Sequence, residues 1–204
     1  MLAARHEHEI ATLAERYGAP RRVAAMLGGA AFDPLNRADR YGEVCMVIRR
    51  PNGRVVTAIK TFYPRGAYRL LTGGIGLDEP VEQALWREVA EETGLHVRVV
   101  AFLAVIEYRF ATPHARVFPE RSDNADFVTY AFLLDELAGT LAMHDPDEDH
   151  ESFCEIEPAR LPVLANQLAQ VPDTISERIG GSWRDWGRFR AVVHSVVAEQ
   201  LALP

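Results

Sequence analysis

The chain has 204 residues, of which 48% are hydrophobic, 25% charged and 9% aromatic. These values are those of an average globular protein and exclude disordered, collagen-like and coiled-coil chains. A net charge of -7 disfavours general binding to nucleic acid. The longest apolar run, 99–106, is far shorter than the roughly 20 residues that span a bilayer. We therefore expect a protein that neither binds nucleic acid nor spans a membrane.

The two cysteines, Cys45 and Cys154, lie more than 100 positions apart and show no metal-ligand spacing. This usage favours reduced thiols and a reducing compartment. The N-terminus carries charges at Arg5, Glu7 and Glu9, so no secretory leader is visible. A cytoplasmic location is the expectation.

The N-terminal residues are interpreted as two helices followed by a linker. A helix is expected over residues 5–17, ending at Gly18, and a second short helix over 20–27, ending at Gly28 and Gly29. Residues 33–42, rich in Asp, Pro, Asn and Gly, are interpreted as the linker. The sequence thus predicts an N-terminal helical extension over residues 1–40.

Two apolar runs, 44–48 and 55–59, flank Asn52 and Gly53, which is a strong hairpin signal. No Asp or Glu occurs from Val44 to Leu77, and this stretch instead holds six cations: Arg49, Arg50, Arg54, Lys60, Arg65 and Arg69. Exposed arginines on an edge hairpin and a surface that faces phosphate explain this pattern equally well.

A turn-forming segment is expected over residues 72–78, followed by a helix from Pro80 to its terminator Gly94. On that helix, Glu88, Glu91 and Glu92 lie on or beside the apolar stripe rather than opposite it. Their repulsion and the negative end of the helix dipole oppose this placement. Because converging carboxylates suit a hard divalent cation, we interpret them as a metal site.

The rest of the chain predicts strands over 96–110 and 126–134, joined by a long connection containing Pro113 and Pro119. An acidic loop over 144–151, a strand over 152–156 and a helix over 158–170 follow. The closing helix, 183–201, carries an apolar stripe at helical spacing, which is typical of core packing.

One segment resembles the Nudix box, namely Gly, five residues, Glu, seven residues, Arg-Glu-apolar, one residue, Glu-Glu, one residue, Gly-apolar. The matching residues are Gly73, Glu79, Arg87, Glu88, Val89, Glu91, Glu92, Gly94 and Leu95. The order of the flanking elements extends this resemblance to about residues 41–170.

The resemblance implies an α/β/α sandwich around a mixed sheet, with a Nudix domain at 41–170 and a C-terminal helix, in 171–204, packed on it. It implies hydrolysis of a nucleoside diphosphate linked to another group, with Mg²⁺ or Mn²⁺. Glu88, Glu91 and Glu92 would be the metal ligands, and Glu79 with Arg87 would orient them. The main-chain carbonyl of Thr72 or Gly73 would complete the coordination shell.

Three further assignments remain open between named candidates. Arg49, Lys60 or Arg69 would neutralise a substrate phosphate. The general base would be Glu91 within the box, or Glu148 or Glu151 in the acidic loop, which otherwise is a solvated turn. Relatives are often homodimers, but neither terminal pattern distinguishes an interface from a core.

Residues outside the box give weaker indications of the substrate than the box gives of the reaction. The segment 63–66, Tyr-Pro-Arg-Gly, resembles the corresponding segment of ADP-ribose pyrophosphatases, and Pro113 lies near their downstream proline. An adenine could stack on Tyr63, Tyr68 or Phe62. One alternative hypothesis is a non-catalytic nucleotide sensor, which the complete box disfavours. The other is an isopentenyl diphosphate isomerase, which would need Cys45 as a catalytic thiol.

Overall fold

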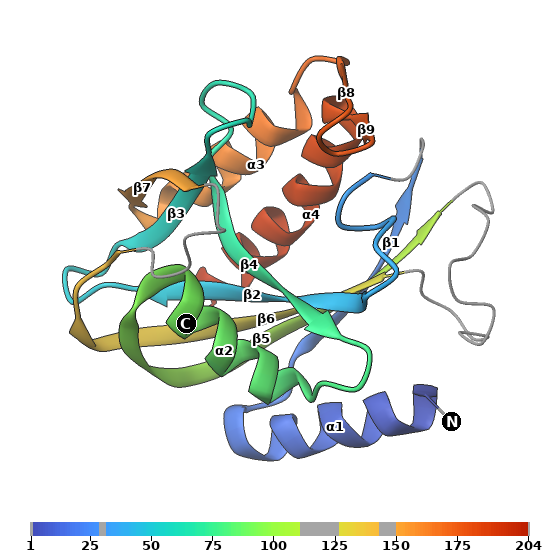
Figure 1. Cartoon of the computed structure of the whole chain (residues 1–204). Helices are drawn as coiled ribbons and strands as arrows, with labels where there is room; N and C mark the ends of the chain where they lie inside the picture. The colour runs from blue at the N-terminus through green and yellow to red at the C-terminus, as the bar shows by residue number, and fades with distance from the viewer. Residues whose placement is uncertain (1, 29–31, 111–126, 143–149, 204) are drawn as a thin grey trace.

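The structure is a computed structural model that describes residues 2–28, 32–110, 127–142 and 150–203. A seven-stranded mixed sheet lies between two helical layers (Figure 1). The elements in chain order are α1 (Leu2–Tyr17), β1 (Arg21–Leu27), β2 (Arg40–Arg49), β3 (Val55–Lys60), β4 (Arg69–Gly76), α2 (Val81–Thr93), β5 (Leu95–Phe110), β6 (Phe127–Gly139), β7 (His150–Ile156), a 3₁₀ turn (Pro158–Arg160), α3 (Leu161–Ala169), β8 (Ile175–Ser176), β9 (Gly181–Ser182) and α4 (Trp183–Leu201).

The strand order in the main sheet is β1-β5-β6-β2-β4-β3-β7. The pairs β1–β5 and β2–β6 are parallel, and all other neighbours are antiparallel. The two short strands β8 and β9 form a separate hairpin just before α4. The predicted α/β/α sandwich with a mixed sheet is therefore confirmed.

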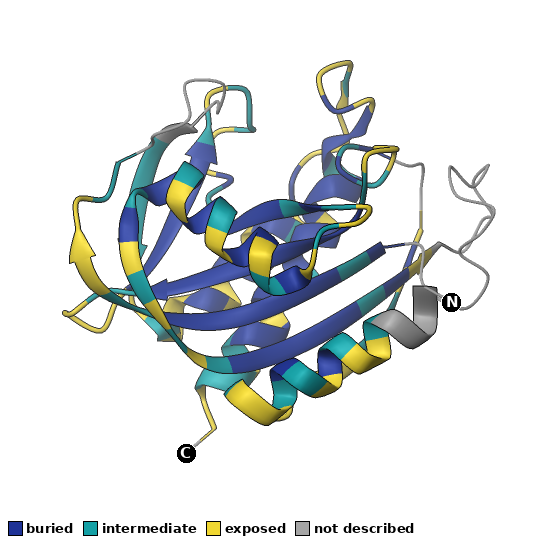
Figure 2. Ribbon diagram, turned by 60° about the horizontal axis from the view of Figure 1, so that its bottom comes forward, coloured by how far each residue is buried: buried dark blue, intermediate teal, exposed yellow. Residues whose placement is uncertain are grey.

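Each face of the sheet has its own apolar core, which the buried strands separate (Figure 2). On one face, α1 and α2 pack through Ile10, Leu13, Leu85 and Val89. On the other face, α3 and α4 pack through residues that include Trp186. Among the described residues, no helix is long and apolar enough to cross a membrane.

The prediction of a second helix over residues 20–27 is wrong, because these residues form the edge strand β1. β1 runs parallel to β5 in a register that aligns Arg21 with Ala104. Burial alternates along it, so that Val23, Ala25 and Leu27 face the core. The pairing partner lies about 80 residues downstream, and its open edge overrides the local helical preference of alanine and leucine. The expected extension over 1–40 is thus not wholly helical, and its strand belongs to the main sheet.

The turn expected over residues 72–78 is also wrong in extent, because β4 continues through Gly73 and Gly74 to Gly76. Only residues 77 and 78 form the turn before α2. The glycines serve close packing rather than a change of chain direction: a Cβ at Gly73 would lie 2.0 Å from Glu88 Cδ, and one at Gly74 would lie 2.4 Å from Arg40 Nη1.

The predicted turn at Asn52–Gly53 is present, but the two strands it joins soon diverge. Gly53 has a φ of 82°, and the Arg54 amide donates to Asn52 Oδ1. β2 and β3 pair only at Arg49 and Val55, and β4 lies between them for the rest of their length. This insertion places Gly73 of β4 beside Val44 of β2, the central strand of the sheet.

The remaining elements follow the expectations closely. α2 and α4 have the predicted positions, and the helix over 158–170 appears as the 3₁₀ turn followed by α3. Residues 33–42, interpreted as a linker, are tied to the β8–β9 hairpin, because the Asp33 amide donates to the Ile179 carbonyl. The domain boundaries at 40 and 170 stay predictions, since β1 and α4 both contribute to the folded unit.

Candidate active site

Helix α2 presents its acids because both of its ends are fixed. Pro80 is the N-cap residue, one position before its expected place, and Gly94 ends the helix with a φ of 63°. The Val81 amide donates to Glu9 Oε1 of α1, so a residue from a distant helix caps α2. Leu85 anchors the apolar stripe in the core.

The three glutamates of α2 differ in exposure. Glu88 and Glu92 are buried, with 8% and 2% of their surface exposed, whereas Glu91 is half-buried. Carboxylates this far from water need nearby cations or hydrogen-bond donors. Glu88 and Glu92 therefore do not belong to a solvated face, in agreement with the placement predicted from the sequence.

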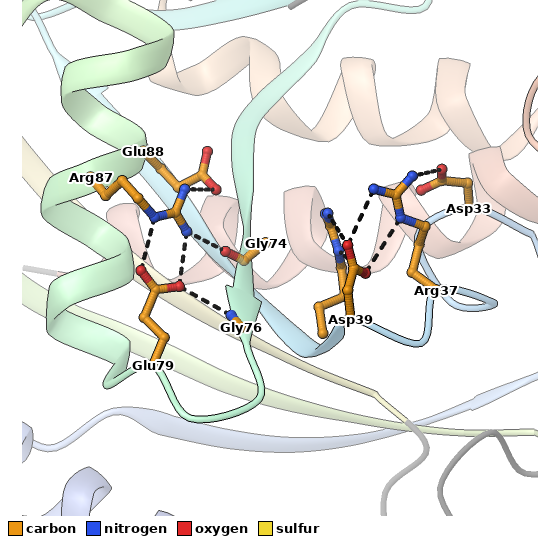
Figure 3. Close-up of polar contacts among 9 residues, drawn as sticks. Asp33, Arg37, Asp39, Gly74, Gly76, Glu79, Arg87 and Glu88 are labelled. Atoms are coloured by element: carbon orange, nitrogen blue, oxygen red, sulfur yellow. Dashed lines mark hydrogen bonds and ion pairs between the residues drawn. The ribbon is translucent and has the colours of Figure 1, made fainter. Parts of the chain in front are cut away.

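Arg87 joins the acids of the site (Figure 3). Its guanidinium donates to both oxygens of Glu79 at 2.8 and 2.9 Å, to Glu88 at 2.8 Å and to Glu91 at 2.9 Å. It also donates to the Gly74 carbonyl at 2.8 Å. The hydrogen bond from Arg87 lowers the pKa of Glu79, and the same bond raises the pKa of Arg87. The orienting role expected of Glu79 and Arg87 is consistent with this geometry.

The Glu88 carboxylate occupies the space where a side chain at Gly73 would lie. A Cβ there would be 2.0 Å from Cδ and 2.2 Å from Oε2 of Glu88. Strand β4 thus holds the carboxylate on one side while Arg87 holds it on the other. Any residue other than glycine at position 73 would displace Glu88.

The acids open into a pocket of about 470 Å³. It contains more cations than carboxylates, which suits an anionic ligand. The residues that line it are Asp33, Pro34, Arg37, Arg40, Glu43, Lys60, Phe62, Tyr63, Arg69, Thr72, Gly73, Gly74, Arg87, Glu88, Glu91, Glu92, Arg178, Ile179, Trp186 and Arg190.

Two of the three basic residues proposed from the sequence reach this pocket. Lys60 lines it, and so does Arg69, which is only 3% exposed and donates to the Tyr63 hydroxyl at 3.1 Å. Burial alone would lower the pKa of Arg69, but Tyr63 and Glu92 outweigh it and the pKa is raised. Arg49 is not among the lining residues and pairs with Asp135 at 2.7 Å. The structure therefore does not bring Arg49 to the site.

Of the aromatic candidates, Phe62 and Tyr63 line the pocket. Tyr68 is not among the lining residues, and its hydroxyl lies 2.7 Å from the Ser152 hydroxyl. Tyr63 packs edge-on against Trp186, with ring centroids 4.7 Å apart. The pocket that contains the acids of α2 thus also has an aromatic lining from Phe62, Tyr63 and Trp186.

Sequence reasoning missed the pocket residues that come from the ends of the chain. Arg190 of α4 is 4% exposed and donates to both oxygens of Glu43 at 2.8 Å. Thr129 also donates to Glu43. The signal available was a charged residue within the apolar stripe of 183–201, but its partner lies 147 positions away. The pairing is a product of the tertiary fold.

Helix α4 is attached to β4 by His194. The Leu70 amide donates to His194 Nε2 at 2.8 Å, so the proton resides on Nδ1, which donates to the Arg190 carbonyl at 2.6 Å. His194 is fully buried, and this burial lowers its pKa to about 3. The neutral imidazole therefore joins the two elements that carry Arg69 and Arg190.

The donor chemistry of the pocket fits a hard divalent cation. Glu88 Oε1 and Glu91 Oε2 both accept from Arg87 Nη1, so two carboxylates approach one point, and Glu92 lines the same pocket. Within residues 2–28, 32–110, 127–142 and 150–203, no three His, Cys, Asp or Glu side chains form a ready-made metal cluster. Glu88 and Glu91, which Arg87 holds together, and Glu92 of the same pocket are the carboxylates available to a cation.

Glu148, one of the two loop candidates for the general base, falls in 143–149, outside the described residues. The other candidate, Glu151, belongs to strand β7 and not to the loop predicted over 144–151, and its side chain is outside the described part. Glu91 is the base candidate that the described pocket contains.

Cys45, the residue an isomerase reading requires, is fully buried in β2. Burial raises the pKa of its thiol. Cys45 is not among the residues that line the pocket. A protonated thiol without access to the pocket cannot act as an acid–base or nucleophilic group there.

Comparisons with known proteins cover most of the chain. The model of the NUDIX domain matches residues 40–178. A "Putative mutator protein MutT4" of Mycobacterium tuberculosis is 32% identical over 155 residues, which cover 74% of this chain and 55% of that protein. An ADP-ribose pyrophosphatase of Methanocaldococcus jannaschii is 28% identical over 107 residues, 52% of this chain and 57% of that protein.

The chain thus spans just over half the length of these two relatives. Among solved structures, a MutT NUDIX hydrolase from Burkholderia pseudomallei is 20% identical with a TM-score of 0.46, covering 80% of this chain and 98% of that one.

Proposed function

Because the chain belongs to the Nudix family, whose domain spans residues 40–178, we propose that it hydrolyses the pyrophosphate bond of a nucleoside diphosphate linked to another moiety. The observation that carries this proposal is the Arg87 network, which gathers Glu79, Glu88 and Glu91 at one wall of a cation-rich pocket. Water attack on a phosphorus atom requires that the phosphate charges be neutralised and the water positioned. This pocket offers groups for both tasks.

Glu88, Glu91 and Glu92 would hold Mg²⁺ or Mn²⁺. When bound, the cation would neutralise phosphate charge and make a bound water more acidic. Arg87 and Glu79 fix the carboxylates from behind, so the ligands need little rearrangement.

Lys60 and Arg69 are proposed to bind the phosphate that leaves. Both line the pocket, and Arg69 comes from the start of β4, the strand that also carries Gly73. The contact of Arg69 with Tyr63 fixes its guanidinium before a ligand arrives. A cation held in place in this way loses little freedom on binding.

Glu91 is the proposed general base. It is half-buried where Glu88 and Glu92 are buried, so water reaches its carboxylate. A base must lie within reach of the water that it deprotonates, and Glu91 lines the same pocket as the other acids.

We propose ADP-ribose or a similar nucleotide sugar as the substrate. Support comes from the segment 63–66, which places Tyr63 on the pocket wall, and from the similarity to the Methanocaldococcus jannaschii protein. Tyr63 and Phe62 supply ring faces on which an adenine could stack.

The test is phosphate release, coupled to a phosphatase, for ADP-ribose, NADH, dinucleoside polyphosphates, nucleoside triphosphates and sugar nucleotides with Mg²⁺ or Mn²⁺. Glu91→Gln should lower kcat at least about a hundredfold. Glu157→Gln is the matched control, since Glu157 is an exposed carboxylate outside the pocket that pairs with Arg54. Tight nucleotide binding without turnover of any compound would refute hydrolysis and support the sensor.

A further inference from the structure

Arg40 of β2 lies outside the Nudix box but shares the pocket with it. Its guanidinium lies over Gly74, where a Cβ would be 2.4 Å from Nη1 and 2.6 Å from Cζ. The position of Arg40 therefore depends on the absence of a side chain at residue 74. The first residue of β2 thus depends for its position on a glycine of β4, the strand that precedes α2.

Gly74, over which the Arg40 guanidinium lies, is also part of the hydrogen-bond network of the acids. The Gly74 carbonyl accepts from Arg87 Nη2, and the adjoining Gly73 makes room for Glu88. Figure 3 shows Gly74 between the Arg87 network and the group of Arg37 and Asp39. Because successive residues of a strand point to opposite faces, these consecutive glycines admit a carboxylate on one face of β4 and a guanidinium on the other.

The hydrogen bonds of Arg40 leave one terminal nitrogen for a ligand. Asp39 accepts from Nε at 3.2 Å and from Nη2 at 3.5 Å. Among the described residues none accepts a hydrogen bond from Nη1. Asp39 is 58% exposed, so solvent screens this ion pair and a dianionic ligand can compete with it.

We propose that Arg40 is a substrate-binding residue that donates from Nη1 to a phosphate oxygen of the diphosphate. Gly74 leaves the space that the Arg40 guanidinium needs for this position. A guanidinium matches the oxygens of a phosphate in geometry and charge. Carboxylates that hold a cation and an arginine that holds phosphate oxygens then meet the same diphosphate from neighbouring positions. The inference rests on the proposed function for the identity of the ligand.

The experiment titrates α,β-methylene-ADP, a diphosphate that resists hydrolysis, calorimetrically in the presence of Mg²⁺. Arg40→Gln should raise its Kd about ten- to a hundredfold, the range expected for a lost charged hydrogen bond. Gly74→Ala should raise the Kd about tenfold, because the new methyl group displaces the flexible guanidinium rather than the strand. In the Arg40→Gln background, Gly74→Ala should change the Kd less than twofold.

The control is Arg54→Gln, which removes an exposed arginine paired with Glu157 outside the pocket and should leave the Kd unchanged. A Kd for Arg40→Gln within twofold of wild type would overturn the proposal. If Gly74→Ala raised the Kd by the same factor in the wild-type and the Arg40→Gln backgrounds, the proposed role of Gly74 in positioning Arg40 would be refuted. Weakened analogue binding in a protein that turns over no substrate would refute the hydrolase alone, since binding is measured separately from turnover.

Discussion

The buried imidazole of His194 makes the stability of this protein depend on pH in a specific way. Its pKa is lowered from 6.5 to about 3, chiefly by burial, against the opposing effect of its hydrogen bond to the Arg190 carbonyl. The unfolded chain therefore binds a proton between pH 6.5 and 3 that the folded chain does not. This contribution to stability is complete above pH 6.5 and decreases as the pH falls toward 3.

The size of the effect follows from the pKa difference. Each unit of pH below the unfolded pKa costs about 1.4 kcal/mol, so His194 alone should lower the free energy of unfolding by about 2 kcal/mol at pH 5. Protonation would also turn the Nε2 acceptor into a donor that faces the Leu70 amide.

Urea unfolding from pH 8 to pH 5 of wild type and His194→Gln measures this contribution. At pH 8 the variant should be less stable by about 1–3 kcal/mol, because one glutamine amide cannot replace both the acceptor for the Leu70 amide and the donor to the Arg190 carbonyl. By pH 5 the gap should narrow by about 2 kcal/mol, since the variant has no imidazole to protonate. His96→Gln, at an exposed position on β5, should keep the wild-type profile. A gap that stays constant between pH 8 and pH 5 would refute the reasoning.

Three further substitutions test the fold around the site. Glu9→Ala removes the acceptor of the Val81 amide and should lower the free energy of unfolding by about 1 kcal/mol in a urea titration. Gly73→Ala should displace the Glu88 carboxylate and lower kcat about a hundredfold or more, with an unchanged circular dichroism spectrum. Cys45→Ser should leave kcat within about twofold of wild type and lower the melting temperature, because a hydroxyl replaces a fully buried thiol.

For each of the three substitutions, one outcome would contradict the prediction. Unchanged stability of Glu9→Ala would mean that water or a neighbouring group caps α2 equally well. Full turnover by Gly73→Ala would show that Glu88 has a second productive position. Loss of turnover by Cys45→Ser, with the fold intact, would restore a thiol to the chemistry.

Local sequence rules predicted the box helix because its evidence is local. Pro80, Gly94 and the spacing of Glu88, Glu91 and Glu92 all lie within a few turns, so one helix rotation brings the acids together. The closing helix, 183–201, was predicted for the same reason.

The errors arose where the partner is distant in sequence. Residues 20–27 carry helix-favouring alanines, but β5 offers an unpaired edge that only the assembled sheet provides. The glycines at 73 and 74 were interpreted as a turn because glycine is common in turns. Their structural role is to admit Glu88 and Arg40, neither of which is adjacent in sequence.

The sequence by itself determined the family, the α/β/α class and the acids of α2, because a motif and helix periodicity are properties of neighbouring residues. Tertiary structure alone decided which cations reach the pocket. Of the three cations predicted from the sequence, Lys60 and Arg69 line the pocket, whereas Arg49 pairs with Asp135. Arg40 and Arg190 line the pocket although the sequence did not indicate them. Those choices depend on strand order, since inserting β4 between β2 and β3 sets which side chains face the acids. No local pattern encodes that order, because it emerges when distant edges pair and two apolar faces are buried together.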